Sequence, residues 1–295
     1  MHFNNIGAGR LGTTLSSALI NQTQWQLTAI CNQHLDTAQH QVRLLNSGQA
    51  VALISALPHA PVTFITTSDD NLAAVTEALA SNPFLMPGDM VVHCSGVYSS
   101  AILSPLKNRG CQVASLHPLK AFPSRKPNPE AFFQCDCVVD GDEPVVTFLS
   151  TLFGQLGAKV ISLSSEKKQL YHAAATMASN YVVTLACSAT SLLIDAGIEP
   201  SQAKLMCERL IENSLHNIKV SARPEQALTG PLMRGDMNTL LLHLNAIKSP
   251  HIEGLYRAAG LATLSLTNHS DDHLAALNAL LTESISSLNL YIGAP

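Results

Sequence analysis

The stretch HFNNIGAGRLGTTLSSALI, residues 2–20, joins a short apolar segment to a helical pattern through three glycines. Gly7, Gly9 and Gly12 form the spacing G-x-G-x-x-G directly after the predicted strand His2–Ile6. In such a pattern the first glycine permits a tight turn, the second lets a pyrophosphate approach the backbone, and the third lets the helix pack closely on the strand. The anion then lies at the helix N-terminus. The stretch therefore predicts a dinucleotide-binding turn, with a tight turn that binds nothing as the alternative.

The pattern of the whole chain agrees with this beginning. Short apolar runs alternate with amphipathic segments over about the first 160 residues, and the remainder shows helical periodicity. This predicts an α/β, Rossmann-like, doubly wound parallel sheet in residues 1–164, followed by an all-α domain in residues 165–295. The predicted strands are 2–6, 26–31, 51–54, 62–66, 90–94, 112–116, 135–139 and 159–163. The predicted helices of the second domain are 166–196, 201–221, 236–247, 251–266 and 271–292.

The composition is that of a globular chain with a large core. Of 295 residues, 46% are hydrophobic and 13% are charged, and the net charge is −4. No run of like charges appears, so neither nucleic acid nor a membrane surface is expected as a partner. The sequence lacks a secretory signal pattern and an uninterrupted apolar run of roughly 18 residues, and its seven cysteines are scattered. We therefore expect a cytoplasmic protein with free thiols and no metal site.

The end of the second predicted strand bears on the choice of dinucleotide. An NAD-preferring site usually places an Asp or Glu there, about 20 residues beyond the glycines, to hold the ribose 2′-hydroxyl. Here the sequence reads Cys31, Asn32, Gln33, without an acid. The repulsion against a 2′-phosphate is therefore missing, and Arg10 in the glycine turn adds positive charge. These features predict NADP over NAD, although no Arg or Lys directly follows the strand.

Polar residues follow the fourth, fifth and sixth predicted strands, in the segments TTSDD, HCSG and LHPLKAF. Ligands of an open α/β sheet bind at the carboxyl ends of the strands. A helix-capping role for the Thr and Ser residues, and a hydrogen-bonded loop role for His117, are the alternatives. The predicted cofactor-binding residues are Gly7, Gly9, Arg10, Leu11, Gly12, Asn32, Thr66, Thr67, Ser68 and Ser95, with His117 and Lys120 on the same cleft.

The segment QLYHAAATMASNYVVT, residues 169–184, is a mostly small and apolar helix that carries Tyr171, His172 and Asn180. It begins after the last predicted strand, so Tyr171 and His172 are expected near the domain junction. At about 100° per residue, Asn180 lies roughly 80° around the helix from His172, and both can border one cavity. The alternative is tight packing of a small-residue helix around a buried, paired histidine.

A second polar segment, ALTGPLMRGD, covers residues 227–236. Gly230 and Pro231 predict a loop, and Asp236 is expected to cap the following helix. Arg234 is one of few cations available to bind an anionic substrate. Pairing of Arg234 with a nearby carboxylate is the alternative.

Several segments together carry a family resemblance: GAGRLG, HCSG, LHPLKAF, YHAAATMASNY, ALTGPLMRGD and LYRAAGLATL. They resemble an uncharacterised bacterial family assigned as oxidoreductases, within the 6-phosphogluconate-dehydrogenase-like superfamily, and the resemblance spans nearly the whole chain. It implies a Rossmann-like NADP-binding domain, a helical domain like the C-terminal domain of 6-phosphogluconate dehydrogenase, an active site between the domains, and a dimer built through the helical domains. Related branches include pyrroline-5-carboxylate reductases, ketopantoate reductases, 3-hydroxyisobutyrate dehydrogenases and prephenate dehydrogenases.

Two positions take a role from this resemblance. The hydroxyacid and ketopantoate branches place a catalytic Lys with a following Asn on the long interdomain helix; here that Lys is missing, and His172 with Asn180 stands nearest its place. The His-Pro dipeptide at His117 is similar to a segment that carries a catalytic His in prephenate dehydrogenases, although the surrounding sequence differs.

These patterns predict an NADP-dependent oxidoreductase that exchanges a hydride with a small carbonyl/hydroxy or imine/amine pair. His172 or His117 is the expected general acid/base, because imidazole titrates near neutral pH. A non-catalytic dimer that senses NADP(H) is the alternative from another class. The expected substrate contacts are Asn180 and Ser95 for the reacting oxygen, and Arg234 and Lys120 for a carboxylate.

Overall fold

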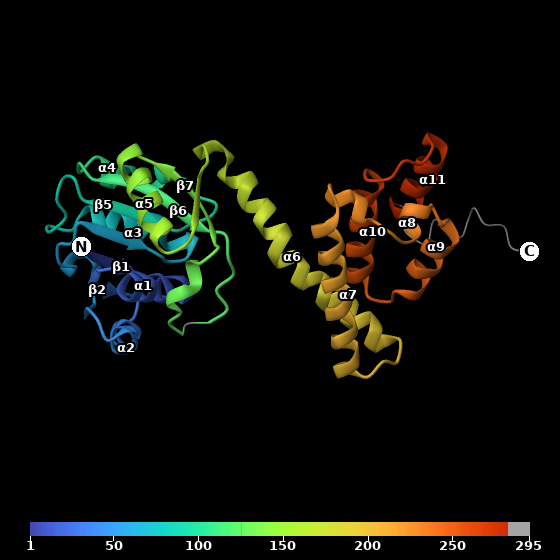
Figure 1. Cartoon of the computed structure of the whole chain (residues 1–295), viewed down its shortest axis with the longest axis horizontal. Coiled ribbons are helices and arrows are strands. Elements are labelled where there is room, and N and C mark those ends of the chain that lie inside the picture. The colour runs from blue at the N-terminus through green and yellow to red at the C-terminus, as the bar shows by residue number, and fades with distance from the viewer. Residues whose placement is uncertain (125, 283–295) are drawn as a thin grey trace, which may run out of the picture. The chain divides into compact units, whose positions relative to one another are not determined.

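The structure is a computed structural model that describes residues 1–124 and 126–282. The chain divides into two compact units, Met1–Asn180 and a second that begins at Tyr181. The division falls inside helix α6 (Lys168–Asp195), so the first turns of this helix belong to the first unit (Figure 1). The sequence placed the domain boundary at 164/165, just before this helix, because the strand pattern stops there.

The first unit is built on an eight-stranded sheet in the order β3-β2-β1-β4-β5-β6-β7-β8 (Figure 1). Strands β1 to β6 pair in parallel. The predicted α/β class and the Rossmann-like sheet are therefore confirmed. The strands are β1 His2–Ile6, β2 Gln26–Cys31, β3 Gln49–Val51, β4 Val62–Ile65, β5 Met90–His93, β6 Gln112–Pro118, β7 Asp136–Gly141 and β8 Lys159–Ser162.

Strand β7 departs from the predicted parallel pattern, and there the expectation is wrong. It pairs antiparallel with β6, with Ser115 opposite Asp140, and β8 then runs parallel to β7. A parallel pair needs a crossover connection, usually a helix. The described residues between β6 and β7 form only the 3-10 turn η3 (Pro129–Phe132), so the chain folds back. The strand predicted at 51–54 begins two residues earlier in the structure, as β3 (Gln49–Val51), which pairs with β2. The chain then forms the 3-10 turn η1 (Ile54–Ala56).

Helices cover both faces of the sheet. Helices α1 and α5 pack on the face that carries Phe3 and Phe64, and α3 and α4 pack on the face that carries Ile6 and Ile65. Neighbouring strand residues such as Phe64 and Ile65 enter different clusters because successive side chains point to opposite faces. The bounds of the helices are α1 Arg10–Gln22, α2 Leu35–Leu45, α3 Asp69–Ala80, η2 Ser100–Leu103, α4 Ser104–Lys107, α5 Glu143–Gln155 and η4 Ser165–Lys167.

Two asparagines, Asn4 and Asn5, interrupt the apolar pattern of β1, and both are buried. Asn5 Nδ2 donates to the Gly12 carbonyl oxygen and to Ser16 Oγ, each at 2.9 Å, and Asn5 Oδ1 accepts from Thr66 Oγ1 at 2.8 Å. A buried amide is tolerated when its hydrogen bonds are made. Asn5 therefore ties the glycine turn and α1 to the end of β4, on either side of the crevice where the strand order reverses.

The second unit is helical, with a core of Leu240, Leu244, Leu264, Leu277 and Leu281. The five predicted helices correspond to α6, α7, α9, α10 and α11. The last was predicted to extend to residue 292, and its part beyond α11 lies outside the described residues. After α6 (Figure 1), the elements are α7 Pro200–Val220, η5 Pro224–Ala227, α8 Pro231–Arg234, α9 Met237–Ala246, α10 Pro250–Leu264 and α11 Asp271–Thr282.

Helix α6 is unusually apolar for an exposed helix. The stretch Ser165–Asp195 is long and apolar enough to cross a membrane by length and composition, with a mean hydropathy of 1.4, and none of that window is buried within the chain. Polar side chains such as His172 and Asn180 punctuate this stretch, so the sequence shows no uninterrupted apolar run. One such helix is weak evidence for a membrane span.

Candidate functional site

The glycine turn after β1 leaves space that side chains would fill. Gly7 has φ +88°, a left-handed conformation that favours glycine. A Cβ on Gly7 would lie 2.6 Å from Thr67 Cγ2, and a Cβ on Gly12 would collide with Thr66 Oγ1. A Cβ on Gly9 would instead meet open space, with its nearest neighbour at 3.8 Å. The first and third glycines are thus required by packing, and the second leaves the backbone open to a ligand.

A larger cavity, of about 550 Å³, opens beside this turn. It lies at the ends of β1 and β2, between η1 and α3, and Gly7, Asn32 and Thr67 line it. Asn32 Oδ1 accepts from the Ala8 N–H at 2.6 Å, whereas Asn32 Nδ2 and Thr67 Oγ1 are buried without a hydrogen-bond partner among the described residues. Buried polar groups are seldom left unpaired, so these two atoms fit a ligand that brings its own hydrogen-bonding groups.

A smaller cavity, of about 220 Å³, adjoins the larger one at Thr67. It is formed by residues that follow β4, β5 and β6 and by the start of α6, so every residue that lines it belongs to the first unit. The expected contribution of the second domain stays a prediction. The lining residues are Leu11, Thr66, Thr67, Asp69, Cys94, Ser95, Gly96, His117, Pro118, Lys120, Phe122 and His172.

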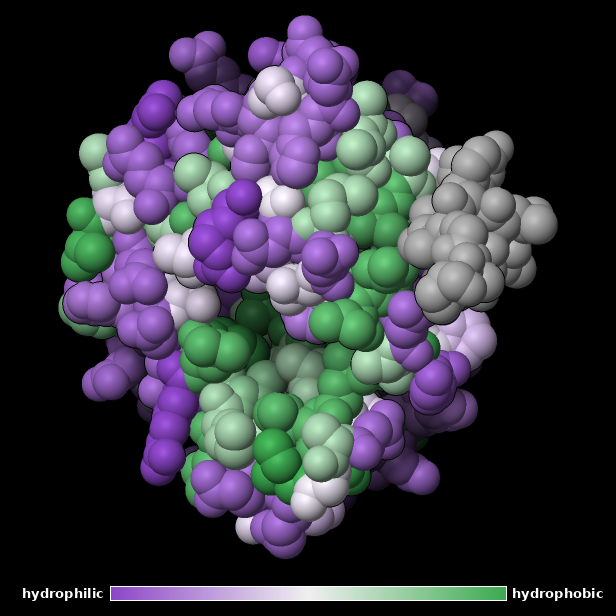
Figure 2. All heavy atoms as spheres, turned by 90° about the vertical axis from the view of Figure 1, so that its right-hand side faces the viewer, coloured by the Kyte–Doolittle hydropathy of each residue, from purple (hydrophilic) through white to green (hydrophobic). Residues whose placement is uncertain are grey.

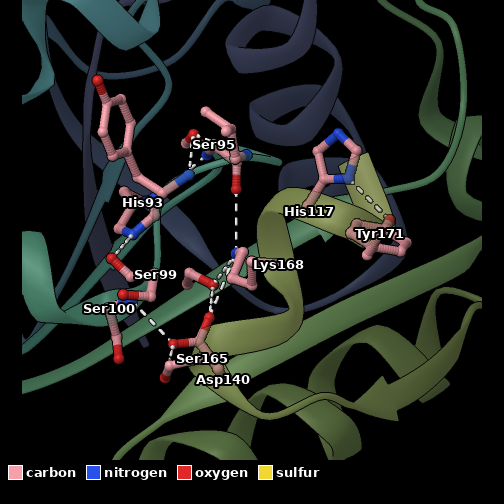
Figure 3. Close-up of polar contacts among 12 residues, drawn as sticks. His93, Ser95, Ser99, Ser100, His117, Asp140, Ser165, Lys168 and Tyr171 are labelled. Carbon is pink, nitrogen blue, oxygen red and sulfur yellow. Dashed lines mark hydrogen bonds and ion pairs between the residues drawn. The ribbon is translucent and has the colours of Figure 1, made fainter. Parts of the chain in front are cut away.

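Two histidines meet in this cavity, and the Tyr171 side chain contacts one of them. The His117 and His172 rings have centroids 5.6 Å apart at an interplanar angle of 78°. A Cβ on Gly96 would collide with His172 and lie 2.9 Å from His117 Nε2, so the glycine is what allows both rings to approach. His117 Nδ1 lies 2.9 Å from the Tyr171 hydroxyl, and the two side chains point toward one another (Figure 3).

The protonation of the pair follows from its burial. Burial, followed by the charges of His172 and Lys168, lowers the pKa of His117 to about 4, against an opposing effect of Asp69. Burial likewise raises the pKa of Tyr171 to about 12, so the phenol keeps its proton near neutral pH. His117 is therefore neutral, with its ring orientation fixed by Tyr171. His172, the other ring of the pair, also lines the cavity.

The HCSG segment, residues 93–96, forms the turn after β5 and contacts the histidine pair through Gly96. Burial lowers the pKa of His93 to about 4, so this ring is also neutral. His93 Nε2 donates to the Ser99 carbonyl oxygen at 3.0 Å, which leaves Nδ1 to accept from the Ser95 N–H at 3.2 Å. Ser95 Oγ accepts from the N–H groups of Val97 and Tyr98 at 3.2 and 3.1 Å. Its own hydroxyl hydrogen is not used in these bonds and can be offered to a ligand.

Lys120 and Asn180 lie in different surroundings. Lys120 lines the smaller cavity, but its Nζ donates to the Ala131 carbonyl oxygen at 2.7 Å. Asn180 is exposed and lies eight residues, or about 12 Å, along α6 from His172, and it is not among the residues that line the cavity. The angular spacing that suggested a shared cavity ignores this axial distance. Their roles toward a substrate stay predictions.

Arg234 belongs to the second unit, and its role as a substrate ligand also stays a prediction. Its side chain is 62% exposed and pairs with Asp236, with Nη2 and Oδ2 2.7 Å apart. Asp236 stands at the N-cap of α9 but makes no capping bond with its side chain, because the carboxylate turns to Arg234. The prediction that the Asp236 side chain caps the following helix is therefore wrong. Arg234 instead forms the ion pair with a nearby carboxylate that was the alternative for this residue.

Four predicted cofactor-binding residues line neither cavity: Gly12, which packs against Thr66, and the three residues Gly9, Arg10 and Ser68. Arg10 begins α1 with an exposed side chain, next to the open backbone of Gly9. Ser68 stands at the N-cap of α3 without a capping bond, and its Oγ accepts from Asn71 Nδ2 at 2.8 Å. All three lie at the N-termini of helices that face the crevice, where an anion is stabilised.

Lys168 is a buried charge that the sequence analysis missed. Its side chain is 0% exposed, and Nζ lies 3.2 Å from Asp140 Oδ1 and 3.2 Å from the Ser95 carbonyl oxygen (Figure 3). Burial lowers the pKa of Lys168, and Asp140 partly offsets this. Burial would raise the pKa of Asp140, but hydrogen bonds from Ser115 and Ser100 together with the Lys168 charge hold it below its ordinary value. In the sequence, the carboxylate of Asp140 at the end of the apolar run CVVD could have indicated a buried charge that needs a positively charged partner.

We expect Gly96→Ala to separate the two histidines. The added methyl collides with His172, so turnover should fall by about tenfold or more, with a loss of about 1–3 kcal/mol in the free energy of unfolding from overpacking. Gly254→Ala is the matched control, because a Cβ there meets nothing within 4 Å. Turnover and urea unfolding of both variants check this. An alanine at position 96 that leaves both unchanged contradicts the close approach of the rings.

Acid should destabilise the first unit through its neutral histidines. Unfolded histidine binds a proton near pH 6.5, whereas folded His93 and His117 bind one only near pH 4. Unfolding therefore takes up protons between these values, and the free energy of unfolding falls as the pH falls through this window. We expect His117→Asn to flatten this dependence by up to about 1 kcal/mol per pH unit, whereas exposed His40→Ala should not. Urea unfolding at several pH values measures it; equal slopes contradict the assignment.

Two segments of the chain match known protein families. Residues 2–118 match the family described as a Rossmann-like domain, and residues 135–263 match the family described as a domain of unknown function, DUF2520. The chain is a Rossmann-like domain followed by a DUF2520 domain. The DUF2520 match begins at the edge of β7, so it includes Asp140, Lys168 and His172 as well as most of the helical unit. The Rossmann-like domain that the resemblance implied, followed by a second domain of unknown function, is thus confirmed.

Solved structures show the same fold at low sequence identity. A "putative NADP oxidoreductase" from Bacteroides fragilis is 18% identical with a TM-score of 0.75, over 90% of this chain and 98% of that one. A protein from Thermotoga maritima is 24% identical with a TM-score of 0.64, over 95% and 98%. A reductive aminase from Aspergillus terreus, in complex with NADPH and ethyl-5-oxohexanoate, is 15% identical with a TM-score of 0.58, over 99% of each chain. No curated protein matches the chain.

Proposed function

We propose that this protein is an NADP(H)-dependent oxidoreductase that acts on a small carbonyl/hydroxy or imine/amine substrate. The observation that carries the proposal is the His117–His172 pair in the smaller cavity, which adjoins at Thr67 the larger cavity with its two unpaired buried atoms. Proton-transferring groups next to a place for a dinucleotide are the arrangement that hydride exchange requires. The structures of like fold include a protein named as an NADP oxidoreductase and a reductive aminase in complex with NADPH, which agrees with the proposal.

The residues present fit a dinucleotide. The open backbone at Gly9 suits a pyrophosphate at the start of α1, and Asn32 Nδ2 can donate to a ribose or 2′-phosphate oxygen. No carboxylate is found among the described residues that line the larger cavity, which favours a 2′-phosphate over a bare 2′-hydroxyl. When bound, the nicotinamide supplies or takes the hydride, and every other task falls to the chain.

The task of the histidines is the proton. Reduction of a C=O or C=N bond adds one hydride to carbon and one proton to oxygen or nitrogen. His172 is the expected donor of that proton, because the neutral His117 beside it cannot carry one near pH 7. His117, held by Tyr171, then hydrogen-bonds the reacting atom in a fixed orientation. In the oxidation direction His172 takes the proton instead. The Ser95 hydroxyl is a further hydrogen-bond donor for the substrate.

A comparison of the two cofactors is the test. NADPH should raise the melting temperature of the protein more than NADH does, since a ligand that binds the native state stabilises it. NADPH oxidation should then be observed with some members of a panel of small 2-oxo acids, ketones and cyclic imines. Stabilisation by NADPH without turnover on any member would favour the NADP(H)-sensing alternative, and the absence of stabilisation by either nucleotide would overturn both.

We also propose that the chain forms a homodimer through its second unit, which the family resemblance implies. A groove of about 770 Å³ between α6 and α7 is lined mainly by apolar side chains such as Leu185, Leu193 and Leu210, and Leu210 is 68% exposed. Hydrophobic side chains also gather around a hollow on one face of the second unit (Figure 2). Exposed apolar areas of this kind mark association surfaces.

Leu210→Glu should therefore shift the protein from dimer to monomer in sedimentation velocity, because the groove would have to bury a carboxylate. Glu212→Gln on the same helix is the control and should leave the dimer intact. A wild-type protein that sediments as a monomer at micromolar concentration contradicts the proposal.

A further inference from the structure

Lys168 and Asp140 form an ion pair that the proposed chemistry does not use. Their side chains are 0% and 3% exposed, and Nζ lies 3.2 Å from Oδ1. Burying two charges costs desolvation free energy that their attraction does not reliably return, so such a pair is weak evidence for stability. The other contacts of the pair therefore show what it does.

Lys168 Nζ contacts three neighbouring segments of the sheet: the turn after β5, the middle of β6 and β7. It donates to the Ser95 carbonyl oxygen after β5 at 3.2 Å and to the Ser115 hydroxyl in β6, and it pairs with Asp140 in β7. The Ser115 hydroxyl donates in turn to Asp140, which also accepts from the Ser100 N–H at 2.8 Å. This network holds the start of α6, four residues before His172, against the turn that follows β5 (Figure 3).

The Ser95 carbonyl belongs to the same peptide group as the Gly96 N–H. In a trans peptide these two groups point in opposite directions, and the described chain has no cis peptide bond. Because the Ser95 oxygen points to Lys168 (Figure 3), the Gly96 N–H points away from it. Gly96 is buried and lines the smaller cavity, and within the described part of the chain its N–H has no hydrogen-bond partner. Buried backbone N–H groups are nearly always paired, so a ligand atom is the missing acceptor.

We propose that Lys168 is a positioning residue that fixes the Ser95–Gly96 peptide so that the Gly96 N–H donates a hydrogen bond to the carbonyl oxygen or imine nitrogen of the substrate. This rests on the proposed function, because the acceptor is the atom that becomes negative or basic as hydride is added. The Lys168 ammonium, bound to the carbonyl of the same peptide, also polarises that peptide and strengthens its N–H as a donor. No bond is made or broken at Lys168 itself.

The variant K168M/D140N tests this without leaving an unpaired buried carboxylate, as Lys168→Met alone would. We expect kcat to fall by about 100-fold, in the range seen when one such donor is lost, with the Kd for NADPH unchanged. Lys167→Met removes the exposed neighbouring charge and should leave both values as in the wild type. If the pair has only a structural role, the folded double variant keeps its kcat, and that outcome overturns the proposal. Weakened NADPH binding with an unchanged kcat assigns the Gly96 donor to the cofactor and also overturns it.

A second measurement does not depend on activity. The amide resonance of Gly96, followed by NMR in protein labelled with ¹⁵N-glycine, should shift in K168M/D140N and stay in place in Lys167→Met, because only the first pair of changes removes the polarising charge. An unmoved resonance contradicts the role of Lys168 even if the wild type turns over no substrate. A wild type without turnover but with the shifted resonance would overturn the proposed function and retain the positioning of the peptide.

Discussion

Replacing His172 by alanine should lower kcat/KM by roughly 10²- to 10⁴-fold, the range that a positioned proton-transfer group contributes. His172 lines the smaller cavity beside His117, whose pKa is lowered to about 4, so the alanine variant keeps only this neutral imidazole on the cavity. The Kd for NADPH should change by less than about threefold, because His172 does not line the larger cavity. Steady-state kinetics and fluorescence titration with NADPH measure the two quantities.

His117→Ala provides the comparison, and His40→Ala the control. Loss of His117 removes the hydrogen bond with Tyr171 and the contact of its ring with His172, so turnover should also fall. His40 is exposed on α2 and lines neither cavity, so its loss should change neither turnover nor NADPH binding. Turnover that survives both His172→Ala and His117→Ala would remove the histidine pair from the mechanism.

Local patterns of the sequence were sufficient to predict the turn that decides the fold. The left-handed φ of Gly7 and the closeness of a Gly12 Cβ to the Gly7 carbonyl oxygen arise within a short strand-turn-helix unit, so the spacing of the glycines reveals them. The contacts of the same glycines with Thr66 and Thr67, by contrast, depend on the position of β4. Because ligands of an open α/β sheet bind at the carboxyl ends of its strands, the sequence predicted that Thr66, Ser95 and His117 lie on one cleft. In the structure all three line one cavity. Their roles in chemistry are a separate question that the predicted variants address.

Long-range pairing explains what the sequence did not reveal. Lys168 sits among charged residues in SSEKKQL and looks solvated, and only its approach to Asp140 and Ser115 makes it a buried residue. The antiparallel turn of β7 is equally non-local, because it depends on the connection after β6 folding back without a crossover helix. Asn5 is similar: an amide in a buried strand becomes understandable once its bonds to the glycine turn and β4 are known.

Replacing Asn32 by aspartate should shift the cofactor preference from NADPH toward NADH by about 100-fold, the effect of roughly 2.7 kcal/mol of added repulsion and lost hydrogen bonding. An aspartate keeps the oxygen that accepts from the Ala8 N–H at 2.6 Å, so the turn is preserved. It replaces the unpaired Nδ2 by a second carboxylate oxygen, which repels a 2′-phosphate and can accept a hydrogen bond from a 2′-hydroxyl.

The ratio of the Kd values for NADPH and NADH measures this change, and it is informative even without a known substrate. Asn46→Asp is the control for added negative charge, because Asn46 is exposed at the end of α2 and lines neither cavity. A long-range effect of charge would weaken NADPH binding in both variants, and it would weaken with added salt. A loss confined to Asn32→Asp, accompanied by retained or improved NADH binding, places the 2′ position of the ribose at Asn32. An unchanged ratio would contradict that placement and would leave the unpaired Nδ2 to some other part of the ligand.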